Sequence, residues 1–232
     1  MDLAARLGAG GVECDVQLSA DGEPVIFHDR DASRLTQVRG RIDRMPWSTI
    51  RTLRVKDKAP IPHLKDVLDW LAGWPNLQLY LDLHAPSQRL LEILAASLSG
   101  SGLKTRAFLL TFWSRRKYLR EAKRIDPQLQ VALMPQTPWS LVERARSVEA
   151  RSLCLGWDDR WWTKGLFKTA CLFADLPREV QDARSAGIGV SGGIANTAED
   201  VDWLLRRGVS EIWTDDVPLA LSALKKEAIA PD

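Results

Sequence analysis

Short apolar stretches that predict β-strands alternate along the chain with stretches of helical periodicity. The strand candidates lie at 11–16, 24–28, 77–83, 106–112, 129–134, 152–156, 187–191 and 210–214. The helix candidates lie at 64–73, 87–99, 115–125, 138–149, 177–186 and 198–207. Strands that alternate with helices in this way favour an α/β fold with a mostly parallel sheet.

The stretch 11–16 places two carboxylates on one side of its predicted strand. Apolar residues alternate with Glu13 and Asp15, and residues i and i+2 of a strand point to the same face. Two carboxylates aimed together repel each other unless a cation or a proton relieves them. Hard oxygen ligands of this kind suit Mg²⁺ or Ca²⁺. A solvated outer face or a salt bridge would also explain the pair.

A β-hairpin is predicted to carry a histidine beside this pair. Residues 24–28 form the next strand and end in His28, and the Asp-Gly pair at 21–22 is typical of a tight hairpin turn. A divalent cation beside a titratable histidine suits metal-assisted phosphoryl chemistry. The hairpin and its terminal His28-Asp29 therefore favour a functional site over an isolated salt bridge.

These residues form a block that resembles the glycerophosphodiester phosphodiesterase family. The block contains Gly-Val-Glu-Cys-Asp-Val at 11–16 and Asp-Gly-Glu-Pro-Val-Ile-Phe-His-Asp at 21–29. It is similar to that family's Glu-x-Asp-Val and to its Asp-Gly-x-Pro-Val motif, which ends in His-Asp. The resemblance returns at 61–68 and at 208–218, so it spans almost the whole chain.

The resemblance implies a fold, a reaction and a set of ligands. The fold would be a (β/α)₈ TIM barrel, formed by a single domain over residues 1–232. The reaction would be the metal-dependent hydrolysis of glycerophosphodiesters, small molecules of lipid metabolism, to glycerol 3-phosphate and an alcohol. Glu13, Asp15 and Asp82 would hold the divalent metal, Mg²⁺ or Ca²⁺, and His28 would be a catalytic acid or base.

Two candidate residues near the end of the stretch 77–83 depart from the family's pattern. Asp82 stands where the family has a third metal-binding glutamate, so the metal would have to shift or to bind through water. His84 stands where the family has a lysine, and it exchanges a permanent charge for a group that titrates near neutral pH. Simple hydrogen bonds at a strand end are the alternative for both. We expect Asp82 to bind the metal and His84 to bind substrate.

The loop near residue 194 carries the last candidate. Asn196 matches the asparagine of the family's Trp-Thr-Val-Asn, whereas the aromatic residue of that motif is replaced by Gly193. We expect Asn196 to bind substrate. Residues 191–193 could present backbone N–H groups to a phosphate, or they could form a plain tight turn. His63 is expected at the start of a helix and not as a ligand.

The largest departure lies at the start of the sequence. The family opens with a strand ending in His-Arg-Gly, which supplies one of its two catalytic histidines, whereas residues 1–8 match part of the following helix. The barrel is therefore expected to lack its first strand. A recorded start later than the true one is favoured, because an open barrel exposes unpaired strand edges. The alternatives are a form that binds its ligand without turnover and an enzyme in which His84 replaces the missing histidine.

The composition gives information on binding partners and on location. With 32 basic and 30 acidic residues, the net charge is only +2, which gives no electrostatic case for nucleic acid. Three scattered cysteines without ligand spacing indicate a reducing compartment, and no secretory signal is recognisable, so a cytoplasmic location is expected. In the tryptophan-rich segment 157–167, core packing or a substrate-loop wall is favoured over membrane contact. The oligomeric state stays open.

Overall fold

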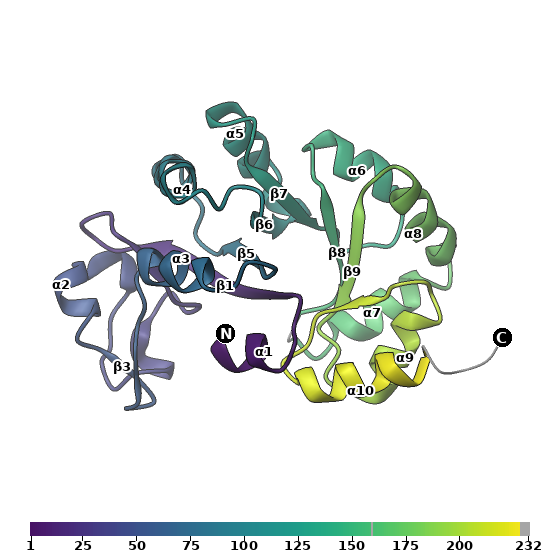
Figure 1. Cartoon of the computed structure of the whole chain (residues 1–232), viewed down its shortest axis with the longest axis horizontal. Helices are drawn as coiled ribbons and strands as arrows, with labels where there is room; N and C mark the ends of the chain where they lie inside the picture. Colours follow the sequence, from purple (N-terminus) through teal and green to yellow (C-terminus); the bar gives the residue numbers. More distant parts are fainter. Residues whose placement is uncertain (159, 228–232) are drawn as a thin grey trace. The chain divides into compact units, whose positions relative to one another are not determined.

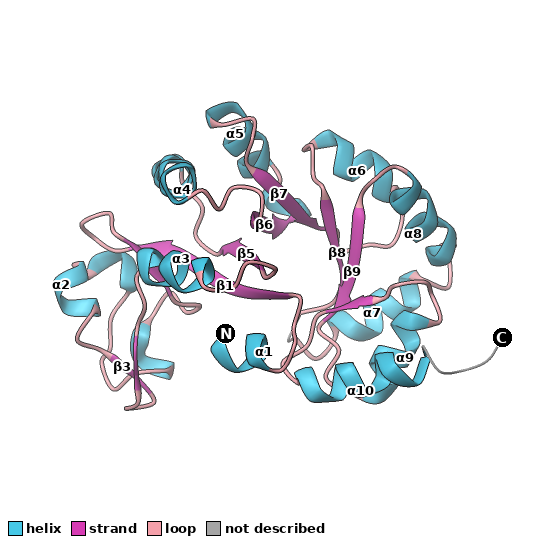
Figure 2. Cartoon of the chain, viewed as in Figure 1, coloured by secondary structure: helices cyan, strands magenta, loops and turns pink. Residues whose placement is uncertain are grey.

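The chain divides into two compact units built from strands and helices (Figures 1 and 2). The computed structural model describes residues 1–158 and 160–227. The first unit comprises residues 10–111 and 117–130. The second comprises residues 2–9, residues 112–116 and the chain from residue 131 onward.

Parallel strands form the centre of the first unit, and one hairpin extends them. The strand order is β2–β1–β5–β6. The hairpin pairs β1 with β2 in the register Val16↔Ile26, which confirms the predicted turn, and β5 lies parallel to β1 on its other side. The strands are β1 (Gly11–Leu18), β2 (Pro24–Ile26), β5 (Gln78–Leu83) and β6 (Ala107–Phe112). The helices that follow them are α3 (Leu64–Ala72), α4 (Gln88–Ser101) and α5 (Lys117–Ile125).

An excursion over residues 27–61, between β2 and α3, forms a hydrophobic core together with Val25 of β2. Its buried residues include Phe27, Ile42, Ile50 and Ile61. The sequence analysis assigned no element to its middle, because the pieces are too short to show a periodicity. They are η1 (Ala32–Arg34), η2 (Ile42–Arg44), α2 (Trp47–Ile50), β3 (Arg54–Val55) and β4 (Ala59–Pro60).

The end of the excursion is tied back to its beginning. Ile26 N donates to Pro62 O at 2.9 Å, and Val25 forms an isolated antiparallel bridge with His63. His63 is the N-cap of α3: its Nδ1 accepts a hydrogen bond from Lys65 N, and Asp66 accepts one from its backbone N–H. The prediction that His63 lies at the start of a helix is therefore confirmed.

Parallel strands also form the second unit, in the order β7–β8–β9–β10. These are β7 (Gln130–Met134), β8 (Ser152–Gly156), β9 (Gly189–Gly193) and β10 (Glu211–Ile212). The helices are α1 (Asp2–Arg6), α6 (Leu141–Ser147), α7 (Thr163–Ala170), α8 (Leu176–Ser185), α9 (Ala198–Leu205) and α10 (Val217–Glu227), and the 3₁₀ turn η3 spans Trp113–Arg115. No helix predicted from the periodicity of the sequence covers α7 or α10.

A buried carboxylate joins α7 to α9. The Asp200 side chain is 4% exposed and accepts hydrogen bonds from Lys164 Nζ at 2.5 Å, Lys168 Nζ at 2.9 Å and Thr197 Oγ1 at 2.9 Å. Burial by itself raises the pKa of Asp200, but the bonds from the two lysines and the threonine outweigh it, so its pKa lies below the ordinary value of 3.8. The carboxylate is therefore charged in the folded chain at neutral pH.

Replacing Asp200 with asparagine is expected to lower the free energy of unfolding by about 2–3 kcal/mol at neutral pH, because two lysines lose their counter-charge. A carboxyl group whose pKa is lowered by folding stabilises the fold above its unfolded pKa, and this contribution disappears as the pH falls through the folded value. The difference between wild type and variant in urea unfolding is thus expected to shrink below about pH 4. A difference that is independent of pH would contradict the ion-pair explanation.

The three cysteines were expected to be scattered, unpaired residues. Cys14 and Cys154 are buried and Cys171 is half-buried, and none of the three is in a disulfide. Burial is the main cause that raises the pKa of Cys14, so its thiol is unreactive.

In the part of the chain that is described, none of the helices combines the length and the apolarity needed to cross a bilayer.

Candidate active site

Three carboxylates gather where β1 and β5 run side by side. Asp15 and Asp82 are partners in the parallel register of the two strands, and Glu13 lies one pleat earlier on β1. One oxygen from each of Glu13, Asp15 and Asp82 lies within 4.8 Å of the others. Glu13 is exposed, whereas the other two are half-buried. The register therefore completes the group that the sequence predicted from the alternation along β1.

Two histidines meet the same aspartate from different strands. His28 follows β2 and His84 follows β5, and a ring nitrogen of each lies within 4.8 Å of the other and of an Asp15 oxygen. His84 Nδ1 is 3.5 Å from Asp15 Oδ1, and the two imidazole rings are tilted with centroids 4.8 Å apart. Asp15 thus belongs both to the carboxylate group and to the imidazole group.

A carboxylate and a guanidinium fix the orientation of the His28 ring. His28 Nδ1 donates to Asp29 Oδ1 at 2.7 Å, and Arg34 holds Asp29 with two hydrogen bonds of 2.6 and 2.7 Å. The bonds from Arg34 are the main cause that lowers the pKa of Asp29 to about 2. With Nδ1 committed to Asp29, Nε2 is the nitrogen available for proton transfer.

The electrostatic environment of His28 favours its protonated form. Partial burial lowers the pKa of His28, but the hydrogen bond to Asp29 and the charges of Asp15 and Asp29 outweigh it, so the pKa lies above the usual 6.5. The sequence analysis named His28 but gave Asp29 and Arg34 no role. The adjacent Asp29 was a visible signal, whereas Arg34 lies in the excursion that has no periodicity.

A buried glutamine holds the backbone on both sides of His28. Gln17, which is 2% exposed, donates from Nε2 to Phe27 O at 2.6 Å and to Asp29 O at 2.9 Å. Gln17 lies two residues beyond Asp15, so its position continues the alternation of the carboxylates along β1. That spacing was the signal in the sequence, but nothing in it identifies the carbonyl groups ten and twelve residues away as partners.

Replacing Gln17 with leucine is expected to lower the free energy of unfolding by about 1–3 kcal/mol, because two carbonyl groups lose a buried donor. It is also expected to reduce the turnover number through misplacement of His28. A double-mutant cycle with His28→Ala tests this route, since the effect of Gln17→Leu on turnover is expected to vanish once the histidine is gone. If the losses of turnover in the two single variants instead add up in the double variant, Gln17 affects turnover by a route other than His28.

Asn196, in the second unit, is held by its own loop. Its Nδ2 donates to Asp215 Oδ2 at 2.7 Å, and its Oδ1 accepts from Asp215 N at 2.8 Å and from Thr214 Oγ1 at 3.1 Å. One side-chain N–H is used for Asp215, and an asparagine has two.

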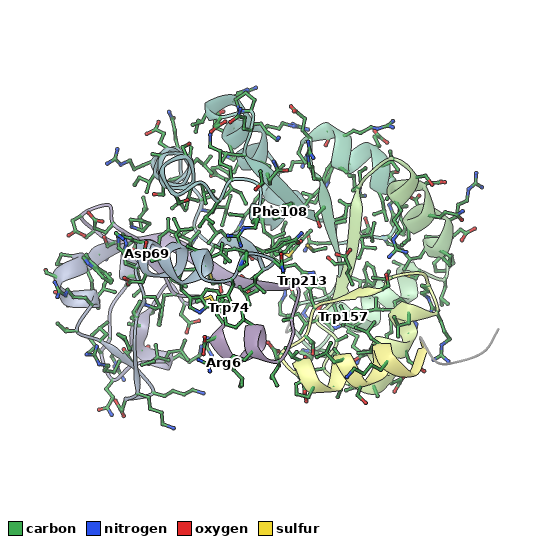
Figure 3. The ribbon with its side chains drawn as sticks, in the orientation of Figure 1. Arg6, Asp69, Trp74, Phe108, Trp157 and Trp213 are labelled. Carbon is green, nitrogen blue, oxygen red and sulfur yellow. The ribbon has the colours of Figure 1, made fainter. Side chains whose placement is uncertain are left out.

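Residues 191–193 form neither a tight turn nor a loop, because they are the end of β9. Close packing leaves no room for a side chain at the two glycines. A Cβ on Gly193 would come within 2.3 Å of Trp213 O, and a Cβ on Gly192 would come within 2.9 Å of Leu204 Cδ2. Trp213, which is labelled in Figure 3, also donates from Nε1 to Ser191 Oγ at 2.7 Å. Close approach between neighbouring chain segments explains these residues without a phosphate.

The sequence profile of the glycerophosphoryl diester phosphodiesterase family matches residues 1–219, almost the whole chain. This chain belongs to that family. Its members include a glycerophosphodiester phosphodiesterase of Caldanaerobacter subterraneus subsp. tengcongensis, which is 24% identical over 96% of this chain and 89% of its own length. Membership of this family places the chain among the phosphoric diester hydrolases.

Two solved structures share the fold of this family member. One is the glycerophosphodiester phosphodiesterase of Agrobacterium tumefaciens, with a TM-score of 0.73 and 21% identity over 95% of this chain and 90% of that one. The other is a phosphodiesterase of Oleispira antarctica in complex with sn-glycerol-3-phosphate, with a TM-score of 0.75 and 24% identity over 96% and 88% of the two chains. The likeness confirms the predicted fold class, an α/β barrel of the TIM type.

Proposed function

We propose that the chain hydrolyses glycerophosphodiesters to glycerol 3-phosphate and an alcohol with the help of a divalent metal, Mg²⁺ or Ca²⁺, in lipid metabolism. The observation that carries this proposal is the position of Asp15, which joins the carboxylates of β1 and β5 to two imidazoles. A cation-binding group and a proton-transfer group within one cluster are what phosphodiester hydrolysis requires.

The chemistry of the carboxylate group fits a hard divalent cation. Glu13, Asp15 and Asp82 offer oxygen ligands from two paired strands, and three carboxylates that lie so close repel one another without a counter-charge. A bound cation would polarise a phosphoryl oxygen and promote ionisation of a neighbouring hydroxyl group. These three residues would hold it.

The proton-transfer role falls to His28. Asp29 holds its Nδ1, so Nε2 gives a proton to the leaving oxygen or takes one from the attacking hydroxyl. His84 and Asn196 would bind substrate: His84 through an imidazole that already lies beside Asp15, and Asn196 through its remaining amide N–H. His84 is also the candidate for the second acid or base, because it is the other imidazole of the cluster.

A second candidate function is ligand binding without turnover. It is favoured by the position of His84, whose Nδ1 lies 3.5 Å from Oδ1 of the proposed metal ligand Asp15. If His84 serves that aspartate and His63 caps α3, His28 alone would be left for proton transfer.

The two functions are separated by one pair of measurements with glycerophosphocholine. Release of sn-glycerol 3-phosphate in the presence of Mg²⁺ or Ca²⁺, followed in an enzyme-coupled assay and abolished by a chelator, is expected for the hydrolase. Calorimetric binding without product after long incubation would establish the binding function instead. Neither binding nor product would refute both for this substrate class.

A further inference from the structure

The segment 161–173 of the second unit exposes a group of large apolar side chains around α7. Their exposed fractions are 91% for Trp161, 43% for Trp162, 61% for Leu166, 77% for Leu172 and 85% for Phe173. For residues 157–167 the sequence favoured core packing or a substrate-loop wall, and core packing is wrong for Trp161, Trp162 and Leu166. We call these five residues the α7 apolar face.

The five exposed side chains lie on α7 and at its two ends. Trp162, the N-cap residue, and Leu166 are four residues apart and lie on the same side of the helix. Trp161 precedes the N-cap, and Leu172 and Phe173 follow the C-cap Cys171 in a turn in which Phe173 N donates to Ala170 O at 3.1 Å. The exposed apolar residues are thus gathered along one short segment of the unit.

The opposite side of α7 is fixed to the body of the unit. Phe167 is 2% exposed and packs against Trp157 and Trp203, with ring centroids 6.1 and 6.4 Å away. Lys164 and Lys168 reach back to the buried Asp200. Because these contacts lock the helix, it cannot roll to bury the α7 apolar face within the unit.

Three basic side chains lie beside this face. Residues 160–173 contain Arg160, Lys164 and Lys168, and the exposed Asp175, the N-cap of α8, follows two residues after Phe173. Arg160 and Lys164 have side chains that are 52% and 40% exposed, whereas their partners Asp158 and Asp200 are only 19% and 4% exposed. Asp159 lies outside the described residues. The solvent thus meets apolar side chains edged by cations, which complements anionic headgroups.

We propose that the α7 apolar face docks on an anionic phospholipid surface. Tryptophan is the residue best suited to the headgroup layer, since its indole is both apolar and a hydrogen-bond donor, and two adjacent tryptophans open this segment. Exposed Trp, Leu and Phe side chains beside basic residues are typical of segments that bind at such an interface. The proposal concerns attachment, so it stands apart from the proposed hydrolysis.

The test is co-sedimentation of the full chain with vesicles of phosphatidylcholine and phosphatidylglycerol in a 4:1 ratio. Wild type is expected to bind, and the double variant Trp161→Ala, Phe173→Ala is expected to partition at least tenfold more weakly, because each lost aromatic removes apolar area from the bilayer. Both side chains are exposed, so the variant is expected to keep its thermal unfolding midpoint. Leu3→Ala, at a side chain in α1 that is 69% exposed, is the matched control and is expected to bind like wild type.

Three results would overturn the proposal. They are failure of wild type to bind the vesicles, unchanged binding by the double variant, and equal binding to vesicles of phosphatidylcholine alone. If wild type instead sediments in solution at twice its 26.0 kDa mass and the double variant as a monomer, with no vesicle binding by either, a second copy of the chain covers the face. Because none of these readouts needs turnover, they are independent of whether the chain hydrolyses glycerophosphodiesters.

Discussion

Replacing Asp15 with asparagine is expected to reduce metal-dependent hydrolysis of glycerophosphocholine to background. The change keeps the shape of the side chain but removes the charge of the residue that belongs to both the carboxylate and the imidazole groups. Cation affinity is expected to fall together with activity, because a neutral amide oxygen is a poorer ligand for Mg²⁺ or Ca²⁺ than a carboxylate. The measurements are the initial rate against metal concentration and calorimetric titration with each metal.

Glu23→Gln is the matched control for this experiment. Glu23 lies beside the turn of the same hairpin, is exposed and pairs with His63 at 3.0 Å, outside both groups. It loses the same charge in a similar local fold, so rate and metal affinity are expected to stay near those of wild type. Undiminished turnover and metal affinity in Asp15→Asn would sink the metal assignment, whereas equal losses in both variants would point to a general electrostatic effect.

Replacing His28 with alanine is expected to lower the turnover number by about 10²- to 10⁴-fold, the usual contribution of a positioned acid or base. Metal affinity in calorimetry is expected to remain, because the proposed cation ligands Glu13, Asp15 and Asp82 are untouched. A loss of turnover with retained metal binding would separate proton transfer from cation binding within the cluster.

The control for His28 is His63→Asn, which removes an imidazole outside the cluster and leaves a residue that can still cap α3. This variant is expected to turn over at nearly the wild-type rate. If His28→Ala changed only the Michaelis constant, His28 would be a substrate-binding residue and not a proton-transfer residue.

The elements that carry the candidate site were predictable because their signals are local. The alternation in β1 fixed the shared face of Glu13 and Asp15, and the Asp-Gly pair fixed the turn that returns the chain to His28. Asp82 required more, because a parallel partner comes from a distant stretch whose register the sequence does not state. The resemblance to a known family supplied that pairing, and the register of β1 with β5 agrees with it.

The remaining features depend on tertiary contacts that leave no local pattern. The excursion 27–61 has elements of only two to four residues, and its core forms from side chains spread over the whole segment. An apolar helix face normally indicates burial, whereas Trp162, the N-cap residue of α7, and Leu166 within it are exposed. Gly193 was interpreted as part of a loop, but its reason is the approach of the Trp213 backbone.

The closure between Ile26 and Pro62 leaves the excursion room to change in length. Its two ends meet at a hydrogen bond and a β-bridge, so a longer or shorter insert could leave the spacing of β2 and α3 unchanged. A change of sequence in the excursion would affect the imidazole group, because Arg34 belongs to the excursion and holds Asp29, the carboxylate bonded to His28. Sequence variation in this segment would therefore change the surroundings of His28 while the carboxylates on β1 and β5 stay in place.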